Sequence, residues 1–162
     1  ALKANGPRIK PKVRLLYTGG HADNPEFFEL LQQNDAHVVS DNTGFGTRAA
    51  DVLICEDGNP LEAIINYYFE EKPAATRQMG TQVERMERLL DLVKRYKADG
   101  VVASRLYMCD LWAFEHFLMR KRLHENNVPF LELEVDYTPE GQGQIKTRVQ
   151  AFVESLADRQ TA

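Results

Sequence analysis

One stretch decides the fold: residues 100–135, GVVASRLYMCDLWAFEHFLMRKRLHENNVPFLELEV. Residues 100–104 are short and apolar, which is typical of a strand buried on both faces of a parallel sheet. A helix is predicted at about 111–125, and asparagines and a proline then end it. Leucine and valine alternate with glutamate over residues 129–135, which predicts a strand with one wetter face at the edge of the sheet.

Further strands and helices alternate on the N-terminal and C-terminal sides of this unit. In chain order they are a strand at 13–17, a helix from Asn24-Pro25, a strand at 36–40, a helix from Asn59-Pro60 to Lys72-Pro73, and helices at 81–97 and 142–158. This order predicts an α/β fold, with a four-stranded, mostly parallel sheet and helices on both faces. We expect a flavodoxin-like sandwich.

Two details of this pattern bear on the site. Residues 49–58 are ambiguous, because the apolar run 51–55 is too short to distinguish an extended segment from a short helix. In the helix at 81–97, Glu84 and Arg88 are spaced for an ion pair on the exposed side, as are Asp91 and Arg95.

Length and composition narrow the class of protein. The 162 residues suit one domain, which we place at 13–158, between a linker or cut end at 1–12 and a tail at 159–162. The net charge of −4 leaves no basic footprint for nucleic acid, and no apolar run reaches the roughly 20 residues of a membrane span. No signal peptide opens the chain, so we expect a cytoplasmic protein without nucleic-acid or membrane partners.

Ligands of such sheets bind beyond the carboxyl ends of the strands, near a switch in strand order. Four predicted loops leave those ends, at residues 18–24, 41–48, 105–110 and 136–144. Their chemically capable side chains are His21, Asp23, Asp41, Thr43, Arg48, Arg105, Tyr107, Cys109 and Asp110. A site is expected to draw on this set.

The 41–48 loop carries two glycines, Gly44 and Gly46. It lacks the third glycine of a dinucleotide-binding fingerprint, and it follows the second strand rather than the first. Turns that need positive φ are the simpler explanation for both glycines. Arg48, just beyond them, could hold a phosphate or stay solvated, and both alternatives remain open.

Cys109 is the strongest single candidate for chemistry. It lies after a predicted strand and just before a helix, where backbone amides favour the thiolate, so it suits a nucleophile or a metal ligand. A buried structural thiol is the alternative, and Cys55 is interpreted as a packing residue. No Ser-His-Asp order and no zinc-type spacing is present, so no catalytic residue is assigned.

Several runs of the sequence resemble one known family. They are DNTGFGTR at 41–48, NPLE at 59–62, DGVV at 99–102, RLYMCD at 105–110, VPFLELEVD at 128–136 and QIKTRVQAFVE at 144–154. Over about residues 12–157 the chain resembles the C-terminal domain of the 2-hydroxyacyl-CoA dehydratase and benzoyl-CoA reductase family. The resemblance implies a domain of a longer enzyme subunit.

The resemblance also implies a chemistry. Members of this family are oxygen-sensitive, iron–sulfur-dependent enzymes that act on an acyl-CoA or aroyl-CoA thioester. An ATP-dependent activator delivers a low-potential electron, and the resulting ketyl radical eliminates water or reduces the ring. The partners implied for this chain are therefore the CoA substrate, a preceding domain, a partner subunit and the activator.

Site residues follow from the resemblance in the same way. Cys109 would ligate a [4Fe-4S] cluster, whose other ligands would come from outside this chain, because such a cluster generally has about four. Tyr107 and Asp110 would tune the cluster or donate a hydrogen bond to the thioester carbonyl. Thr43, Gly44 and Arg48 would contact CoA, and these three are placed only by their loop. The chain alone would be catalytically silent.

One departure keeps other functions open. At residues 72–75 the sequence reads Lys-Pro-Ala-Ala, where many members of the family carry a cysteine. A non-catalytic flavodoxin-like scaffold or interaction subunit is therefore the main alternative. A flavin- or nucleotide-binding module using the same loops is a weaker one, because the phosphate fingerprint is missing.

Overall fold

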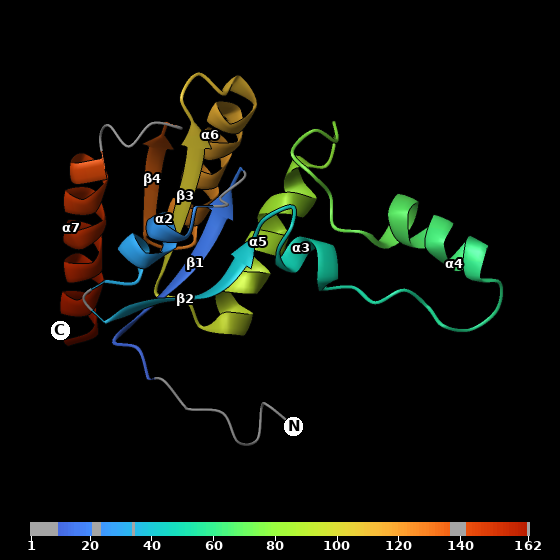
Figure 1. The fold of residues 1–162 in the computed structure, drawn as a ribbon, viewed down its shortest axis with the longest axis horizontal. Helices are drawn as coiled ribbons and strands as arrows, with labels where there is room; N and C mark the ends of the chain where they lie inside the picture. The colour runs from blue at the N-terminus through green and yellow to red at the C-terminus, as the bar shows by residue number, and fades with distance from the viewer. Residues whose placement is uncertain (1–9, 21–23, 34, 137–141, 162) are drawn as a thin grey trace.

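A computed structural model describes residues 10–20, 24–33, 35–136 and 142–161 (Figure 1). The strands are β1 (Val13–Gly19), β2 (Ala36–Asn42), β3 (Gly100–Leu106) and β4 (Phe130–Val135). They form one sheet in the order β2-β1-β3-β4, and every neighbouring pair is parallel. The helices are α2 (Pro25–Leu31), α3 (Thr47–Ala50), α4 (Pro60–Asn66), α5 (Gln82–Tyr96), α6 (Asp110–Glu125) and α7 (Gln142–Thr161), with a π-helical turn, η1 (Tyr67–Glu71), after α4.

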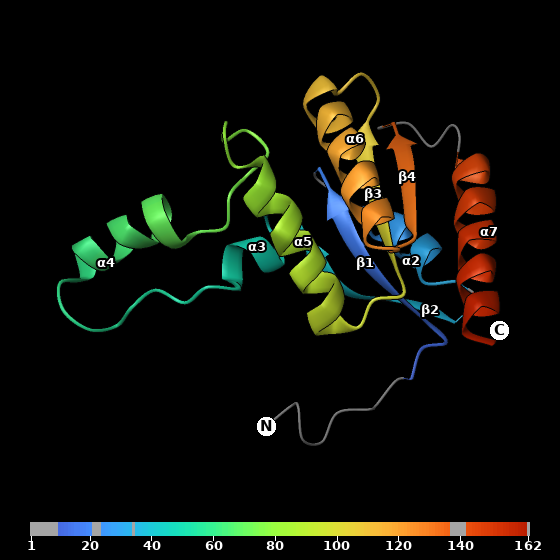
Figure 2. The ribbon, with the colours of Figure 1, turned by 180° about the vertical axis from the view of Figure 1, so that it is seen from behind.

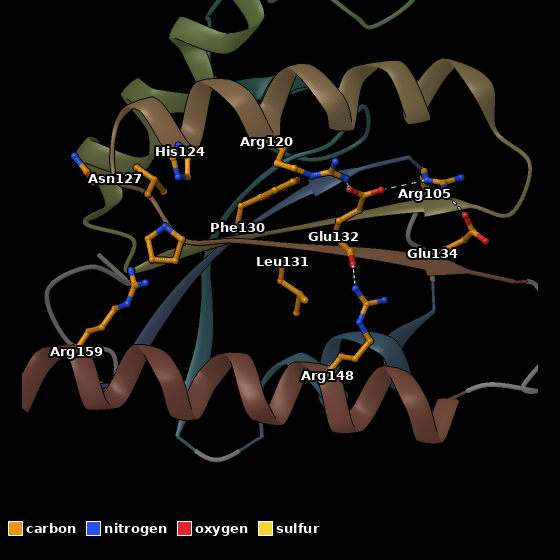
Figure 3. A pocket seen from close by; sticks show the side chains of 12 residues that line it. Arg105, Arg120, His124, Asn127, Phe130, Leu131, Glu132, Glu134, Arg148 and Arg159 are labelled. Carbon is orange, nitrogen blue, oxygen red and sulfur yellow. Dashed lines mark hydrogen bonds and ion pairs between the residues drawn. The ribbon is translucent and has the colours of Figure 1, made fainter.

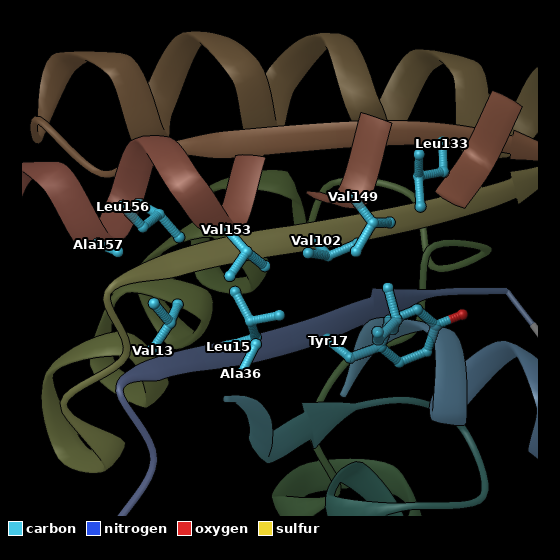
Figure 4. Close-up of a cluster of buried hydrophobic side chains, with 11 residues drawn as sticks. Val13, Leu15, Tyr17, Ala36, Val102, Leu133, Val149, Val153, Leu156 and Ala157 are labelled. Carbon is cyan, nitrogen blue, oxygen red and sulfur yellow. The ribbon is translucent and has the colours of Figure 1, made fainter. Parts of the chain in front are cut away.

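The sheet separates two apolar clusters, one on each face. Neighbouring strand residues point to opposite faces, so Leu15 and Tyr17 of β1 join one cluster while Leu16 joins the other. α2 and α7 cover the first face, where Leu133 of β4 and Val149 of α7 belong to the same buried cluster (Figure 4). α5 and α6 cover the second face. The predicted α/β, flavodoxin-like arrangement is confirmed.

Local signals set the ends of two helices as expected. The Asn24 side chain accepts the Glu26 N–H at 2.9 Å at the start of α2, and the Asn59 side chain accepts the Leu61 N–H at 3.0 Å at the start of α4. Both are N-caps followed by a first-turn proline. α7 continues to Thr161, beyond the end predicted at 158.

The ambiguous segment is a short helix followed by irregular chain. α3 ends at Ala50, and residues 51–59 contain no helix or strand. β4 is the edge strand that its alternating pattern predicts. None of the helices in the described ranges is long and apolar enough to cross a membrane.

Residues 52–72, here called the arm, project away from the sandwich (Figures 1 and 2). No residue of α4 is buried, and in η1 only Tyr67 is, with its hydroxyl donating to the Ala49 carbonyl at 2.9 Å. The large apolar side chains that the arm exposes are Leu53, Ile54, Leu61, Ile64, Ile65, Tyr68 and Phe69. Cys55 is exposed here too, so its interpretation as a packing residue is wrong, because this part of the chain reaches no core.

A buried ion pair fixes the segment that returns from the arm. Arg85 of α5 and Glu115 of α6 form two parallel hydrogen bonds, at 2.7 and 2.8 Å, with both side chains less than a tenth exposed. The remaining Arg85 nitrogen donates to the carbonyls of Ala75 and Gln78 and to the Thr81 hydroxyl. Arg85 therefore joins the base of the arm to both helices of the second face.

Candidate functional site

The order of strands switches between β1 and β3, and their carboxyl ends lie close together. Gly19 has a φ of 148°, and a Cβ there would overlap the Ser104 carbonyl. The Gly20 N–H donates to the same carbonyl at 3.2 Å, and the Trp112 indole lies against Gly20. Glycine is needed at Gly19 because of this φ and this overlap, whereas a Cβ at Gly20 would make only an ordinary contact with Trp112. In folds of this kind a ligand-binding crevice is expected at the switch point, and here Trp112 lies at its side.

Beneath the crevice, the Tyr17 hydroxyl and the Ser104 hydroxyl share a hydrogen bond of 2.5 Å. Burial raises the pKa of Tyr17 to about 12, although the bond to Ser104 favours the charged form and the Asp41 carboxylate opposes it. The phenol therefore stays protonated at neutral pH. It serves as a structural link between β1 and β3 rather than as a base.

Cys109 is the N-cap of α6, the position predicted from the sequence. Its N–H donates to the Leu106 carbonyl at 3.1 Å, in a tight turn where Met108 takes a left-handed φ of 58°. The thiol is free and partly exposed, and Tyr107 and Asp110 flank it as exposed side chains. Exposed large apolar residues surround this turn and continue along α6: Tyr107, Met108, Leu111, Phe114 and Phe117, here called the collar.

The described residues supply two free thiols, Cys109 at the carboxyl edge of the sheet and Cys55 on the arm, and no complete metal site. Among them, no group of three or more His, Cys, Asp or Glu side chains could hold a metal ion. A thiol at a helix N-terminus fits one corner of an iron–sulfur cluster, because the first backbone amides stabilise its negative charge. The other corners require ligands from elsewhere.

The 41–48 loop closes around the Asp41 carboxylate. Thr43 donates to it through its N–H (2.9 Å) and its hydroxyl (2.6 Å), and Thr47 does the same at 3.2 and 3.0 Å. Partial burial opposes the charged form, but these hydrogen bonds outweigh it and lower the pKa of Asp41. The amides of Thr43 and Thr47 are therefore already used by a carboxylate and do not form a cradle for a phosphate.

The glycines of this loop serve close contacts rather than positive φ. A Cβ at Gly46 would overlap the Asp41 carboxylate, and one at Gly44 would lie 2.9 Å from the Arg48 guanidinium. Neither glycine has a positive φ, so the expectation of positive-φ turns is wrong. Arg48 folds back over the loop and is half-buried. Burial, together with the nearby Arg88 and Arg85 cations, lowers the pKa of Arg48.

Residues 1–156 match the sequence model of one protein family, described as 2-hydroxyglutaryl-CoA dehydratase, D-component. The chain belongs to this family. It is 28% identical over 156 residues to YjiM of Escherichia coli (strain K12), which is named as a dehydratase subunit. It is 25% identical over 159 residues to the (R)-phenyllactyl-CoA dehydratase beta subunit of Clostridium sporogenes, and 25% identical over 140 residues to the (R)-2-hydroxyglutaryl-CoA dehydratase beta subunit of Acidaminococcus fermentans.

These relatives of the dehydratase family are much longer than the match. The alignments cover 93%, 96% and 82% of this chain, in that order, but only 39%, 41% and 36% of the relatives. The chain therefore spans about two-fifths of the length of each relative.

In this member of the dehydratase family, the predicted site residues form two groups rather than one. Tyr107, Cys109 and Asp110 follow β3. Asp41 lies near the end of β2, Thr43, Gly44 and Arg48 follow that strand, and β1 lies between β2 and β3. Arg105 belongs to neither group, because it turns outward to Glu132 and Glu134 of β4. The expected His21 and Asp23 lie outside the described residues.

Sequence reasoning missed two residues at this edge. Arg88, expected to pair with Glu84 on the exposed side, instead bonds Asp51 at 3.0 Å and Asn42 at 3.4 Å. The spacing from Glu84 to Arg88 is a local signal, and the tertiary contact of α5 with the end of β2 overrides it. Trp112 was also missed, because an indole inside a predicted helix gives no sign of the crevice beside it.

A second concave region lies on the edge of the sheet, away from this crevice. A groove of about 770 Å³ runs along β4 between α6 and α7 (Figure 3). Arg105 and Arg120 pair with Glu132, and Arg148 donates to the Glu132 carbonyl at 2.7 Å. Four arginines and two glutamates line the groove, so its lining has an excess of positive charge.

Proposed function

We propose that this chain is the part of a 2-hydroxyacyl-CoA dehydratase subunit that supplies one thiolate, Cys109, to an iron–sulfur cluster. The observation that carries the proposal is the partly exposed thiol at a helix N-terminus, at the carboxyl edge of a family member's sheet, inside an exposed apolar collar. Dehydration is favoured over ring reduction, because the relatives are named as dehydratases.

Cys109 would hold one corner of a [4Fe-4S] cluster, with its charge stabilised by the first amides of α6. When bound, such a cluster passes a low-potential electron, delivered by an ATP-dependent activator, to the thioester carbonyl. Tyr107 and Asp110 would lie at the rim, where a phenol or a carboxyl can orient the thioester by hydrogen bonding. The chain alone would be inactive, since the remaining ligands would lie outside it.

The apolar surfaces support an assembly with further protein. Large exposed patches mark interaction sites, and both the collar and the arm expose several aromatic and aliphatic side chains. The arm also carries five carboxylates against one lysine, so the surface that covers it would be apolar with basic residues around it. We assign these surfaces to the rest of the subunit and to a partner subunit, in keeping with the length of the relatives.

CoA would approach from the β2 side of the crevice. Arg48 is the residue suited to one of its phosphates, because a guanidinium binds phosphate through two parallel hydrogen bonds. Gly44 leaves room for Arg48, whereas Thr43 already gives both of its donors to Asp41. Thr43 would therefore support the loop and would contact CoA only through its exposed surface.

The test is anaerobic reconstitution. The chain is co-produced with a dehydratase subunit portion that covers the remaining length of the relatives, and iron, sulfide and visible absorption are measured. We expect about four irons per complex, lost in Cys109→Ser and retained in the matched control Cys55→Ser. Colourless protein that is indifferent to Cys109→Ser would overturn the proposal.

A non-catalytic scaffold is the second candidate. It is favoured because the described residues contain no group of three or more possible metal ligands, and because alanines stand at 74 and 75. A flavin- or nucleotide-binding module is not favoured, because the loop amides that it would need are occupied by Asp41.

A further inference from the structure

The groove along β4 has the volume of a ligand site, and neither the proposed cluster nor the proposed CoA contacts use it. Its volume of about 770 Å³ lies within the roughly 300–1,000 Å³ of pockets that hold small molecules. α6 forms one wall and α7 the other, and the half-buried Phe130, Leu131 and Glu132 of β4 lie between them (Figure 3). This edge of the sheet therefore has room for a ligand.

The charges that line the groove do not balance. Four arginines line it, against two glutamates of β4. Arg105 and Arg120 pair with these two carboxylates. The other two arginines, Arg148 and Arg159 of α7, form no ion pair with any described residue. The two cations on the α7 wall are therefore the ones that an anionic ligand can neutralise.

Arg148 and Arg159 lie at opposite ends of the groove. They are eleven positions apart in α7, which is close to three helical turns, so both point toward β4 (Figure 3). This spacing separates their Cα atoms by about 16 Å along the helix axis. Arg148 donates to the Glu132 carbonyl at 2.7 Å, a neutral acceptor, and keeps its charge. His124 and Asn127 lie at the same end as Arg159 and are further possible donors (Figure 3).

The surface between these two cations is apolar. Leu131 lies between Arg159 and Arg148 in Figure 3, and it is half-buried against the apolar cluster of the first face. Along the α7 side, the groove thus presents a cation, an apolar side chain and a second cation. A complementary ligand has an acid at each end and no charge in the middle.

From this arrangement we infer that the groove binds an elongated small molecule with an acidic group at each end and a neutral, partly apolar middle. A guanidinium binds a carboxylate or a phosphate through two parallel hydrogen bonds, so one arginine suffices for each end. A single small anion engages only one of the two cations, because they lie far apart. The site involves neither Cys109 nor Arg48, and the inference does not depend on the proposed function.

Isothermal titration calorimetry of the chain with three probes tests this inference. Dodecanedioate has two carboxylates on a long methylene chain, the corresponding bisphosphonate has two phosphonates on the same chain, and succinate is too short to reach both arginines. We expect a long probe to bind at least about fivefold more tightly than succinate. The better of the two long probes identifies the acid as a carboxylate or a phosphate. No heat with any probe at millimolar concentration, or equal affinity for succinate and the long probes, overturns the inference.

Variants tie the binding to the two arginines. Arg148→Gln and Arg159→Gln are each expected to weaken binding of the better long probe by about fivefold. Lys146→Gln is the matched control, because Lys146 is an exposed cation of α7 that does not line the groove, and it should leave the affinity nearly unchanged. Equal affinity in all three variants would contradict the inference.

Arg148 also bonds the Glu132 carbonyl, so Arg148→Lys is measured beside Arg148→Gln. Lysine keeps the charge, and we expect Arg148→Lys to bind the probe more tightly than Arg148→Gln does. Equal weakening in both would assign the loss to the changed contact with β4 and overturn the role of this cation.

A probe with one acid distinguishes charge recognition from apolar adsorption. The monomethyl ester of dodecanedioate has the same chain but a single carboxylate, so it should bind about fivefold more weakly than the diacid. An ester that binds as tightly as the diacid overturns the two-ended site. Cys109→Ser should bind all probes normally, so failure of the cluster proposal would leave this result standing.

Discussion

The sandwich and the arm both contain helices with apolar residues at helical spacing, but these residues are buried in the sandwich and exposed in the arm. Leu92 of α5 is fully buried, whereas Leu61 of α4 is 65% exposed and Phe69 of η1 is 80% exposed. Both segments are helical with apolar residues at helical spacing. The comparison teaches that such a pattern shows that a face needs a partner. It does not show that the partner lies in the same chain.

The largest loss of stability is expected from a substitution at the junction of the sandwich and the arm. Glu115→Ala leaves the buried Arg85 without its carboxylate, and breaking a buried pair in this way costs about 3–5 kcal/mol. The free energy of unfolding, measured with urea, should fall by this amount. Proteolysis of the segment 73–81 should also become faster, since Arg85 fixes that segment at the base of the arm.

The matched control for this change is Arg122→Ala. Arg122 pairs with Glu87 and Glu125 on the surface and is 42% exposed, so its loss should lower the free energy of unfolding far less than Glu115→Ala does. Equal losses for Glu115→Ala and Arg122→Ala would mean that the buried pair does not hold the arm's base.

Two identical substitutions sharpen the comparison directly. Leu15→Ala removes a side chain from the core and should cost about 2–5 kcal/mol. Leu61→Ala removes the same atoms from the arm and should change the free energy of unfolding by less than about 0.5 kcal/mol in the isolated chain. Chemical denaturation of both variants measures the difference. A large cost for Leu61→Ala would show that the arm packs on the sandwich in solution.

The smallest expected change in the free energy of unfolding depends on pH and arises from a residue of the sandwich. His116 of α6 is fully buried, and burial lowers its pKa below the ordinary 6.5, partly offset by Glu132, with Arg105 and Arg120 adding to the decrease. As pH falls below 6.5, the unfolded chain takes up a proton that the folded chain resists. The free energy of unfolding should therefore decrease between pH 7 and pH 5.

His116→Gln should flatten this dependence. The lowered carboxyl pKa values of Asp41 and Asp51 act only at more acidic pH, below about their ordinary 3.8, so they do not interfere in this window. Urea titrations at pH 5, 6 and 7 provide the measurement. An unchanged slope in the variant would assign the dependence to another group.

Much of the fold could be predicted from the sequence because its signals are local. Strand runs, asparagine caps and the alternation in 129–135 each act over a few residues, and each is confirmed. The position of Cys109 at the start of α6 was predictable for the same reason. The exposure of Cys55 was not, since its apolar neighbours in sequence are on the arm and far from a core.

The partners of charged residues were the least predictable part of the site. In the sequence, Glu84 is an equally good local partner for Arg88. Arg88 pairs with Asp51 instead, because α5 packs against the end of β2. Likewise, the amides of Thr43 and Thr47 donate to the Asp41 carboxylate, and neither composition nor spacing predicts these hydrogen bonds. Such long-range pairings depend on the finished fold.

The outer edge of β4 has a consequence for how this protein behaves at high concentration. Unprotected edge strands recruit other strands and start fibrillar aggregates. Here Arg148 occupies the outward carbonyl of Glu132, and paired charges from Arg105 and Arg120 stand along the same edge. A neighbouring strand would have to displace these groups before it could bond. This edge of the sheet is therefore protected against pairing with a strand of another molecule.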